Sequence, residues 1–126
     1  MSARKFHIVK HLASLIFSVA VFSPCHAQQS VIDLFKSDQA LAEQHFAKGD
    51  LKEAIRLFER ANKSNEQYAR IGRGYYLLKE YDKSVAAYGA YIKSGKQLEI
   101  TDLTFYAEVL LTLKHYDMAE QAFRKL

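Results

Sequence analysis

A small residue followed four positions later by an aromatic one recurs along this chain and constrains its fold more than any other feature. The pairs are Ala54 and Phe58, Ser84 and Tyr88, and Ala119 and Phe123. They are spaced 30 and then 35 residues apart, and each follows a short turn and a polar or acidic start. Repeats of this length are typical of two-helix units that stack on their neighbours.

The segments around these pairs have the spacing of amphipathic helices. Apolar side chains between Leu51 and Ala61 recur at intervals of three and four residues, which places them on one helix face. Gly49 suits the left-handed residue that ends a preceding helix, and Asp50 with Glu53 has the spacing of a capping box. Proline is absent from this part of the chain. We therefore expect an all-α fold.

The repeats resemble those of the tetratricopeptide repeat (TPR) family, whose small and aromatic residues pack the two helices of each unit together. The resemblance implies a helical-hairpin solenoid of about three units at 35–64, 65–99 and 100–126, the last one truncated. It also implies a set of repeat-packing residues. These are Leu41, Ala42, Ala54, Phe58, Ala61, Tyr68, Ile71, Gly72, Tyr75, Ser84, Tyr88, Ala107, Ala119 and Phe123.

The chain departs from the family pattern at several positions. Asp38 replaces a bulky residue, Tyr91 and Leu126 replace small ones, and the closing proline is missing from both complete repeats. A related two-helix solenoid is the alternative architecture. No capping helix follows the third unit before Leu126, so we expect an open end that a partner covers, or a chain that is part of a longer protein.

The first 27 residues have the pattern of a cleaved secretory signal peptide. Three basic residues and no acidic one precede an apolar run at 12–22, and Ala27 supplies the small residue before the cut. The run has about half of the roughly 20 residues that cross a bilayer, so we expect no membrane span after cleavage. Residues 28–34 would be a short extension. We therefore expect an exported protein, located in the periplasm or at the outer membrane if the source is bacterial, with lipid attachment at Cys25 as a minor alternative.

The charge distribution argues against a nucleic-acid partner. The whole chain has a formal net charge of +4. Three of its 18 basic residues and none of its 14 acidic residues precede Gln28, which leaves 15 against 14 and a net charge of +1. Nucleic-acid binding needs a clustered basic face, whereas acids and bases alternate here.

The sequence offers no catalytic, cofactor or metal site. His45 and His115 are the only histidines after the signal segment, and they lie about two repeats apart. His45 also occupies a packing position of the repeat pattern. No cysteine–histidine or serine–histidine–aspartate grouping can be argued, so we expect a protein that is not an enzyme and binds no cofactor.

The glycines of "RIGRGYYLL" (70–78) resemble half of a phosphate loop, but their context differs. A phosphate loop precedes the start of a helix, whereas this segment is expected inside a helix that begins near Asn65 or Glu66. Gly72 would sit at the close approach of two helices, packed by Tyr75. Gly74 has no explanation in the sequence and should cost about 1 kcal/mol relative to alanine.

In TPR proteins the first helix of each unit lines a concave surface that binds a peptide or a partner helix. The residues that would line it here are Lys36, Gln39, Glu43, Phe46, Glu66, Ala69, Arg73, Tyr76, Thr101, Thr104, Glu108 and Leu111. This mixture differs from the basic, amide-rich clamp with which some members hold a terminal carboxylate. For any single residue, a simple solvated helix face is the alternative interpretation.

The resemblance therefore implies a non-catalytic protein–protein interaction scaffold of the cell envelope. Its partner would be a protein or peptide, bound by the concave face or by the open C-terminal end, where a second copy could also dock. The order of signal and repeats is also similar to the front of OmpA-like peptidoglycan-binding outer-membrane proteins of Bacteroidota. On that alternative, the chain is the N-terminal part of a larger anchor.

Overall fold

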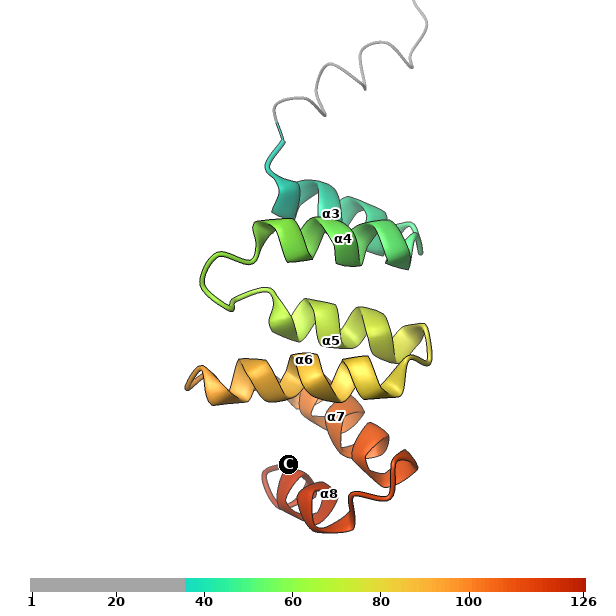
Figure 1. Cartoon of the computed structure of the whole chain (residues 1–126), viewed down its shortest axis with the longest axis vertical. Coiled ribbons are helices and arrows are strands. Elements are labelled where there is room, and N and C mark those ends of the chain that lie inside the picture. Colours follow the sequence, from blue (N-terminus) through green and yellow to red (C-terminus); the bar gives the residue numbers. More distant parts are fainter. Residues whose placement is uncertain (1–35) are drawn as a thin grey trace, which may run out of the picture. The chain divides into compact units, whose positions relative to one another are not determined.

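The computed structural model describes residues 36–126, and the expected signal peptide and extension lie outside the described residues. Within 36–126 the chain forms six α-helices and no strand, which confirms the all-α expectation for this part (Figure 1). The helices are α3 (Asp38–Ala47), α4 (Leu51–Ala61), α5 (Tyr68–Leu77), α6 (Tyr81–Lys93), α7 (Ile100–Thr112) and α8 (Tyr116–Phe123). None of them has the length and hydropathy of a membrane-spanning segment.

Three tight turns pair the helices as α3/α4, α5/α6 and α7/α8 (Figure 1). Each turn places one residue in the left-handed region, namely Gly49, Lys79 and Lys114, with φ of 81°, 61° and 62°. In each case the next residue donates its backbone N–H to a carbonyl five positions earlier, at 2.8–3.0 Å. This is the Schellman arrangement that satisfies the last carbonyls of a helix. The sequence predicted the left-handed residue at Gly49, and Lys79 and Lys114 adopt the same backbone geometry.

The predicted capping box at Asp50 and Glu53 is wrong. The Asp50 side chain makes no capping hydrogen bond, and its Oδ2 instead lies 3.0 Å from His45 Nδ1. The Schellman turn leaves Asp50 at ψ 70°, whereas Ser37, which does cap α3 by accepting from Ala40 N–H, has ψ 153°. An extended N-cap backbone is what places the side chain over the first turn.

The start of α5 also differs from the expected one near Asn65 or Glu66. The helix begins at Tyr68, because Asn65 adopts a left-handed backbone with φ 60°. Asn62 Oδ1 accepts the Gln67 backbone N–H at 3.1 Å and closes this loop. The loop therefore belongs to the connection between hairpins, and Gln67 is the residue immediately before α5.

Buried side chains form one cluster among α3, α4, α5 and α6, and another centred on α6, α7 and α8. Most of the residues expected to pack the repeats are buried. The buried ones are Ala42, Ala54, Phe58, Ile71, Gly72, Ser84, Tyr88, Ala107 and Ala119. Leu41, Ala61, Tyr68 and Tyr75 are half-buried, whereas Phe123 keeps 40% of its surface exposed.

Helix α5 is packed closely on two sides, and its glycines make this possible. A Cβ atom at Gly72 would lie 2.8–2.9 Å from the ring of Tyr88 in α6. A Cβ atom at Gly74 would lie 2.7 Å from Ile55 Cγ1 in α4. Gly74 therefore has a packing role that the sequence did not explain, and the aromatic ring against Gly72 is Tyr88 rather than Tyr75.

Candidate functional site

Residues from the first helix of each hairpin border a cleft of about 260 Å³. Helix α3 contributes to one side, the start of α5 forms the middle, and the start of α7 contributes to the other side. The lining residues are Gln39, Glu43, Glu66, Gln67, Ala69, Arg70, Arg73, Tyr91, Glu99 and Asp102. We call this hollow the acidic cleft, because it has four carboxylates against two guanidinium groups, a net charge of −2.

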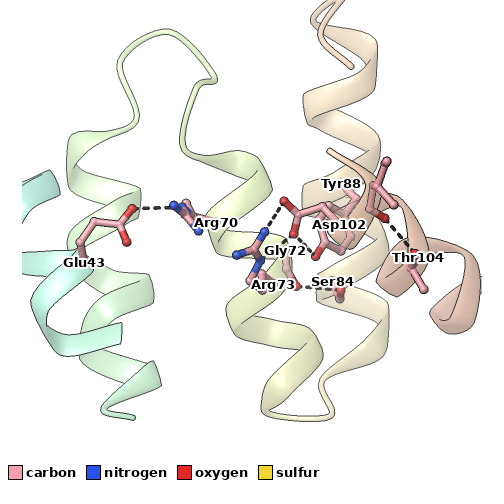
Figure 2. Close-up of polar contacts among 9 residues, drawn as sticks. Glu43, Arg70, Gly72, Arg73, Ser84, Tyr88, Asp102 and Thr104 are labelled. Atoms are coloured by element: carbon pink, nitrogen blue, oxygen red, sulfur yellow. Dashed lines mark hydrogen bonds and ion pairs between the residues drawn. The ribbon is translucent and has the colours of Figure 1, made fainter. Parts of the chain in front are cut away.

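Arg73 and Asp102 form a bidentate ion pair in the cleft (Figure 2). Arg73 Nε donates to Asp102 Oδ1 and Nη2 donates to Oδ2, both at 2.8 Å. The side chains are 18% and 5% exposed, so the pair is largely removed from water. The hydrogen bonds to Asp102 raise the pKa of Arg73 above its usual value. Two parallel charge-assisted bonds fix both position and orientation, so the start of α7 is tied to the middle of α5.

A buried tyrosine completes this network. Tyr88 donates its hydroxyl to Asp102 Oδ1 at 3.0 Å, and Ser84 on the same helix donates to the Gly72 carbonyl at 2.8 Å (Figure 2). Burial, followed by the negative charge of Asp102, raises the pKa of Tyr88 well above its usual value. The phenol therefore stays neutral at ordinary pH and acts as a hydrogen-bond donor. Side chains from α5, α6 and α7 are held together by one carboxylate.

On the other side of the cleft, Glu43 and Arg70 form a second ion pair (Figure 2). Arg70 Nε lies 3.0 Å from Glu43 Oε1, with both side chains about 40% exposed. Pairs this accessible contribute little to stability. The consequence for the cleft is electrostatic, because both guanidinium groups in it already have carboxylate partners.

Two further carboxylates in the cleft have no such partner. Glu66 and Glu99 are exposed, and neither forms an ion pair within residues 36–126. The excess negative charge of the cleft is therefore carried by these two side chains. Tyr91 adds an aromatic ring, and Lys96 Nζ lies 5.8 Å from its centroid while donating to the Ser64 carbonyl.

The structure brings together five of the residues expected on the concave surface and places the others elsewhere. The five in the cleft are Gln39, Glu43, Glu66, Ala69 and Arg73. Phe46 packs edge-on against Phe58, with ring centroids 6.2 Å apart. Lys36 donates to Gln44 Oε1 at 2.7 Å. Thr101 and Leu111 are exposed outside the cleft, and the Thr104 hydroxyl donates to the Ile100 carbonyl (Figure 2).

Tyr76 and Glu108 form a separate pair between α5 and α7. The Tyr76 hydroxyl donates to Glu108 Oε2 at 2.6 Å, and its ring stacks on Phe105 with centroids 4.3 Å apart. The hydrogen bond to Glu108, followed by burial, raises the pKa of Tyr76 to about 12. Both residues were expected to contact a partner, and in the structure they contact each other.

Five residues of the cleft were not among those expected on the concave surface, although Arg70 and Asp102 lie on first helices. They are Gln67, Arg70, Tyr91, Glu99 and Asp102. Gln67 and Glu99 precede their helices, and Tyr91 belongs to a second helix. One signal was available: Tyr91 is an aromatic residue where the repeat pattern has a small one, and its ring lines the cleft.

Apolar side chains are also exposed at the C-terminal hairpin. Tyr116, Met118, Phe123 and Leu126 each keep at least 40% of their surface accessible. Next to them, a hollow of about 200 Å³ is lined by residues including Leu103, Tyr106 and Met118. Phe123 and Leu126 are the residues expected at an open end of the repeats, and that end stays a prediction.

No grouping of histidine, cysteine and acidic side chains within residues 36–126 could hold a metal ion. Comparisons of the chain with known protein families, with curated proteins and with solved structures found no match.

Proposed function

We propose that this chain is an exported, non-catalytic scaffold that binds a segment of a partner protein in the acidic cleft. The observation that carries the proposal is the construction of the cleft. It spans all three hairpins, and the largely buried Arg73–Asp102 pair ties its centre on α5 to its side on α7. A preformed concave surface loses little conformational entropy when it binds a ligand.

The TPR-like reading of the repeats supports the same conclusion. The recurring Schellman turns and the small–aromatic pairs are consistent with three copies of one helical hairpin. Stacked hairpins of this kind create extended concave surfaces suited to binding other chains. The charged groups at the centre of the cleft are bonded to one another, which favours a binding role over a chemical one.

Site-specific photo-crosslinking in the cells that produce the protein tests this proposal. A benzoyl-phenylalanine at Gln39, an exposed position of the cleft, should yield a discrete adduct with a partner protein. The matched control is the same residue at Ala86, which is exposed on α6 and lies outside the cleft. Equal labelling at both positions, or none at Gln39, would contradict the proposal. An adduct at Met118 alone would move the binding surface to the C-terminal hairpin.

A further inference from the structure

One side chain of the acidic cleft has unused hydrogen-bonding capacity. Gln67 is only 6% exposed and lines the cleft. Its backbone N–H is bonded to Asn62, but its side-chain amide makes no hydrogen bond within residues 36–126. No fully buried polar side-chain atom in this range lacks a partner, so the Gln67 amide keeps contact with the cleft.

An amide in this position is suited to a peptide group. It offers both a donor and an acceptor, which are the two functions that a peptide bond presents. A polar group that is largely buried and lacks a hydrogen-bond partner carries a desolvation penalty, and a ligand can offset that penalty by hydrogen bonding to it. Gln67 therefore favours a ligand with a polypeptide backbone over a simple ion.

The charges of the cleft select among peptides. Glu66 and Glu99 are unpaired, whereas Arg70 and Arg73 are already bonded to Glu43 and Asp102. A carboxylate or phosphate would meet two unpaired negative charges and no free guanidinium group. A lysine or arginine side chain would instead find carboxylate acceptors in Glu66 and Glu99, which have no ion-pair partner within residues 36–126.

We infer that the acidic cleft recognises a short, extended, cationic peptide segment, with lysine or arginine held by Glu66 and Glu99 and a neighbouring peptide group held by Gln67. The inference rests on the proposed scaffold function and adds the chemistry of the partner. The volume of about 260 Å³ lies just below the roughly 300–1,000 Å³ of typical small-molecule sites, so the cleft would hold only a short part of the peptide.

Calorimetric titration with three blocked octapeptides tests the inference. The peptides are acetylated and amidated, and differ only at two central positions, which are lysine, glutamine or glutamate. The lysine peptide should bind about fivefold more tightly than the glutamine peptide, which corresponds to roughly 0.5 kcal/mol for each of two accessible ion pairs. The glutamate peptide should bind most weakly. Added salt should reduce the difference between the lysine and glutamine peptides.

Variants assign the selectivity to the cleft. Glu66→Gln with Glu99→Gln should remove most of the preference for lysine, and both side chains are exposed, so the fold should tolerate the change. Asp82→Asn with Asp117→Asn is the matched control, because it removes the same charge from exposed positions outside the cleft. Gln67→Leu should weaken the binding of the lysine peptide and of the glutamine peptide by the same factor. Spermidine, a cation without peptide groups, should not respond to Gln67→Leu.

Three results would overturn the inference. They are equal binding of the lysine and glutamate peptides, an equal loss of selectivity in the control variant, and no binding of any peptide up to about 1 mM, a Kd that corresponds to roughly −4 kcal/mol. If Gln67→Leu weakened the binding of spermidine as much as that of the peptides, Gln67 would not be recognising a peptide group, and recognition of a peptide would be overturned. If any of these results occurs while the crosslink at Gln39 persists, the scaffold proposal stands and only the inference about what the cleft recognises fails.

Discussion

Asp102 is the carboxylate that connects α7 to side chains of α5 and α6. It accepts two hydrogen bonds from Arg73 and one from Tyr88, while its side chain is only 5% exposed. Asp102→Ala should destabilise the chain by about 3 kcal/mol, the lower end of the range for breaking a buried pair, because Arg73 keeps some contact with water. Urea denaturation measures the loss of unfolding free energy.

The matched variant for this prediction removes both charges together. Arg73→Leu with Asp102→Leu leaves no uncompensated ion, and should therefore cost less than Asp102→Ala alone. Asp82→Ala, at an exposed position with no ion pair within 36–126, should change stability by less than about 0.5 kcal/mol. A double variant as unstable as the single one would show that Asp102 acts through something other than Arg73.

Tyr76 should titrate at a higher pH than an ordinary tyrosine. Its pKa is raised to about 12 because its neutral hydroxyl donates to Glu108. The unfolded value is about 10, so this bond contributes fully below about pH 10, and its contribution is lost as pH rises through about 12. Absorbance of tyrosinate should show that Tyr76→Phe removes a transition near pH 12. Glu108→Gln should lower that midpoint, and loss of a transition near pH 10 in Tyr76→Phe would contradict the assignment.

The hairpin turns explain how two lysines come to occupy strained positions. Lys79 and Lys114 have φ of 61° and 62°, in the left-handed region that glycine occupies at position 49. A side chain there costs roughly 1 kcal/mol that glycine avoids. Lys79→Gly and Lys114→Gly should therefore each raise the midpoint of chemical denaturation. Lys52→Gly, within α4, should instead lower it, because glycine costs about 1 kcal/mol inside a helix.

Replacing two helical glycines by alanine should change the stability of the chain in opposite directions. Gly89→Ala should stabilise the chain by up to about 1 kcal/mol through helix propensity, because nothing lies within 4 Å of the added Cβ. Gly74→Ala adds a methyl group 2.7 Å from Ile55 Cγ1. It should therefore lower the unfolding free energy by about 1–3 kcal/mol through overpacking. Thermal unfolding of both variants tests this. The loss for Gly74→Ala should shrink when Ile55 is also alanine, and an unchanged loss would exclude overpacking as its cause.

The parts of the fold that could be predicted are those that depend on nearby residues. Helix periodicity and the turn at Gly49 follow from residues within one or two turns of a helix, and the structure agrees with both. Asp102 could not be recognised as the partner of Arg73, because the two are 29 residues apart and meet only when α7 packs on α5. Gly74 was unexplained for the same reason, since Ile55 belongs to the preceding hairpin.

The described part of the chain is organised as a series of neighbouring contacts. Helices pack mainly on the next helix along the chain, and α5 also packs on α7. In such an arrangement, stability is close to a sum of local terms, so different hairpins can open separately. The acidic cleft spans all three hairpins, and its shape therefore depends on the contacts between them.

Hydrogen exchange should reveal whether the hairpins open separately. Asp102→Ala removes the tie between α7 and α5, so amide exchange should rise most in α7 and α8 and least in α3 and α4. Ile55→Ala is the matched variant, because Ile55 is buried between α4 and α5 and its loss should raise exchange in α3 and α4. Mass spectrometry of proteolytic fragments resolves these regions. A uniform rise over all six helices in both variants would show that residues 36–126 unfold as one cooperative unit, and the cleft would then keep its shape until the whole fold is lost.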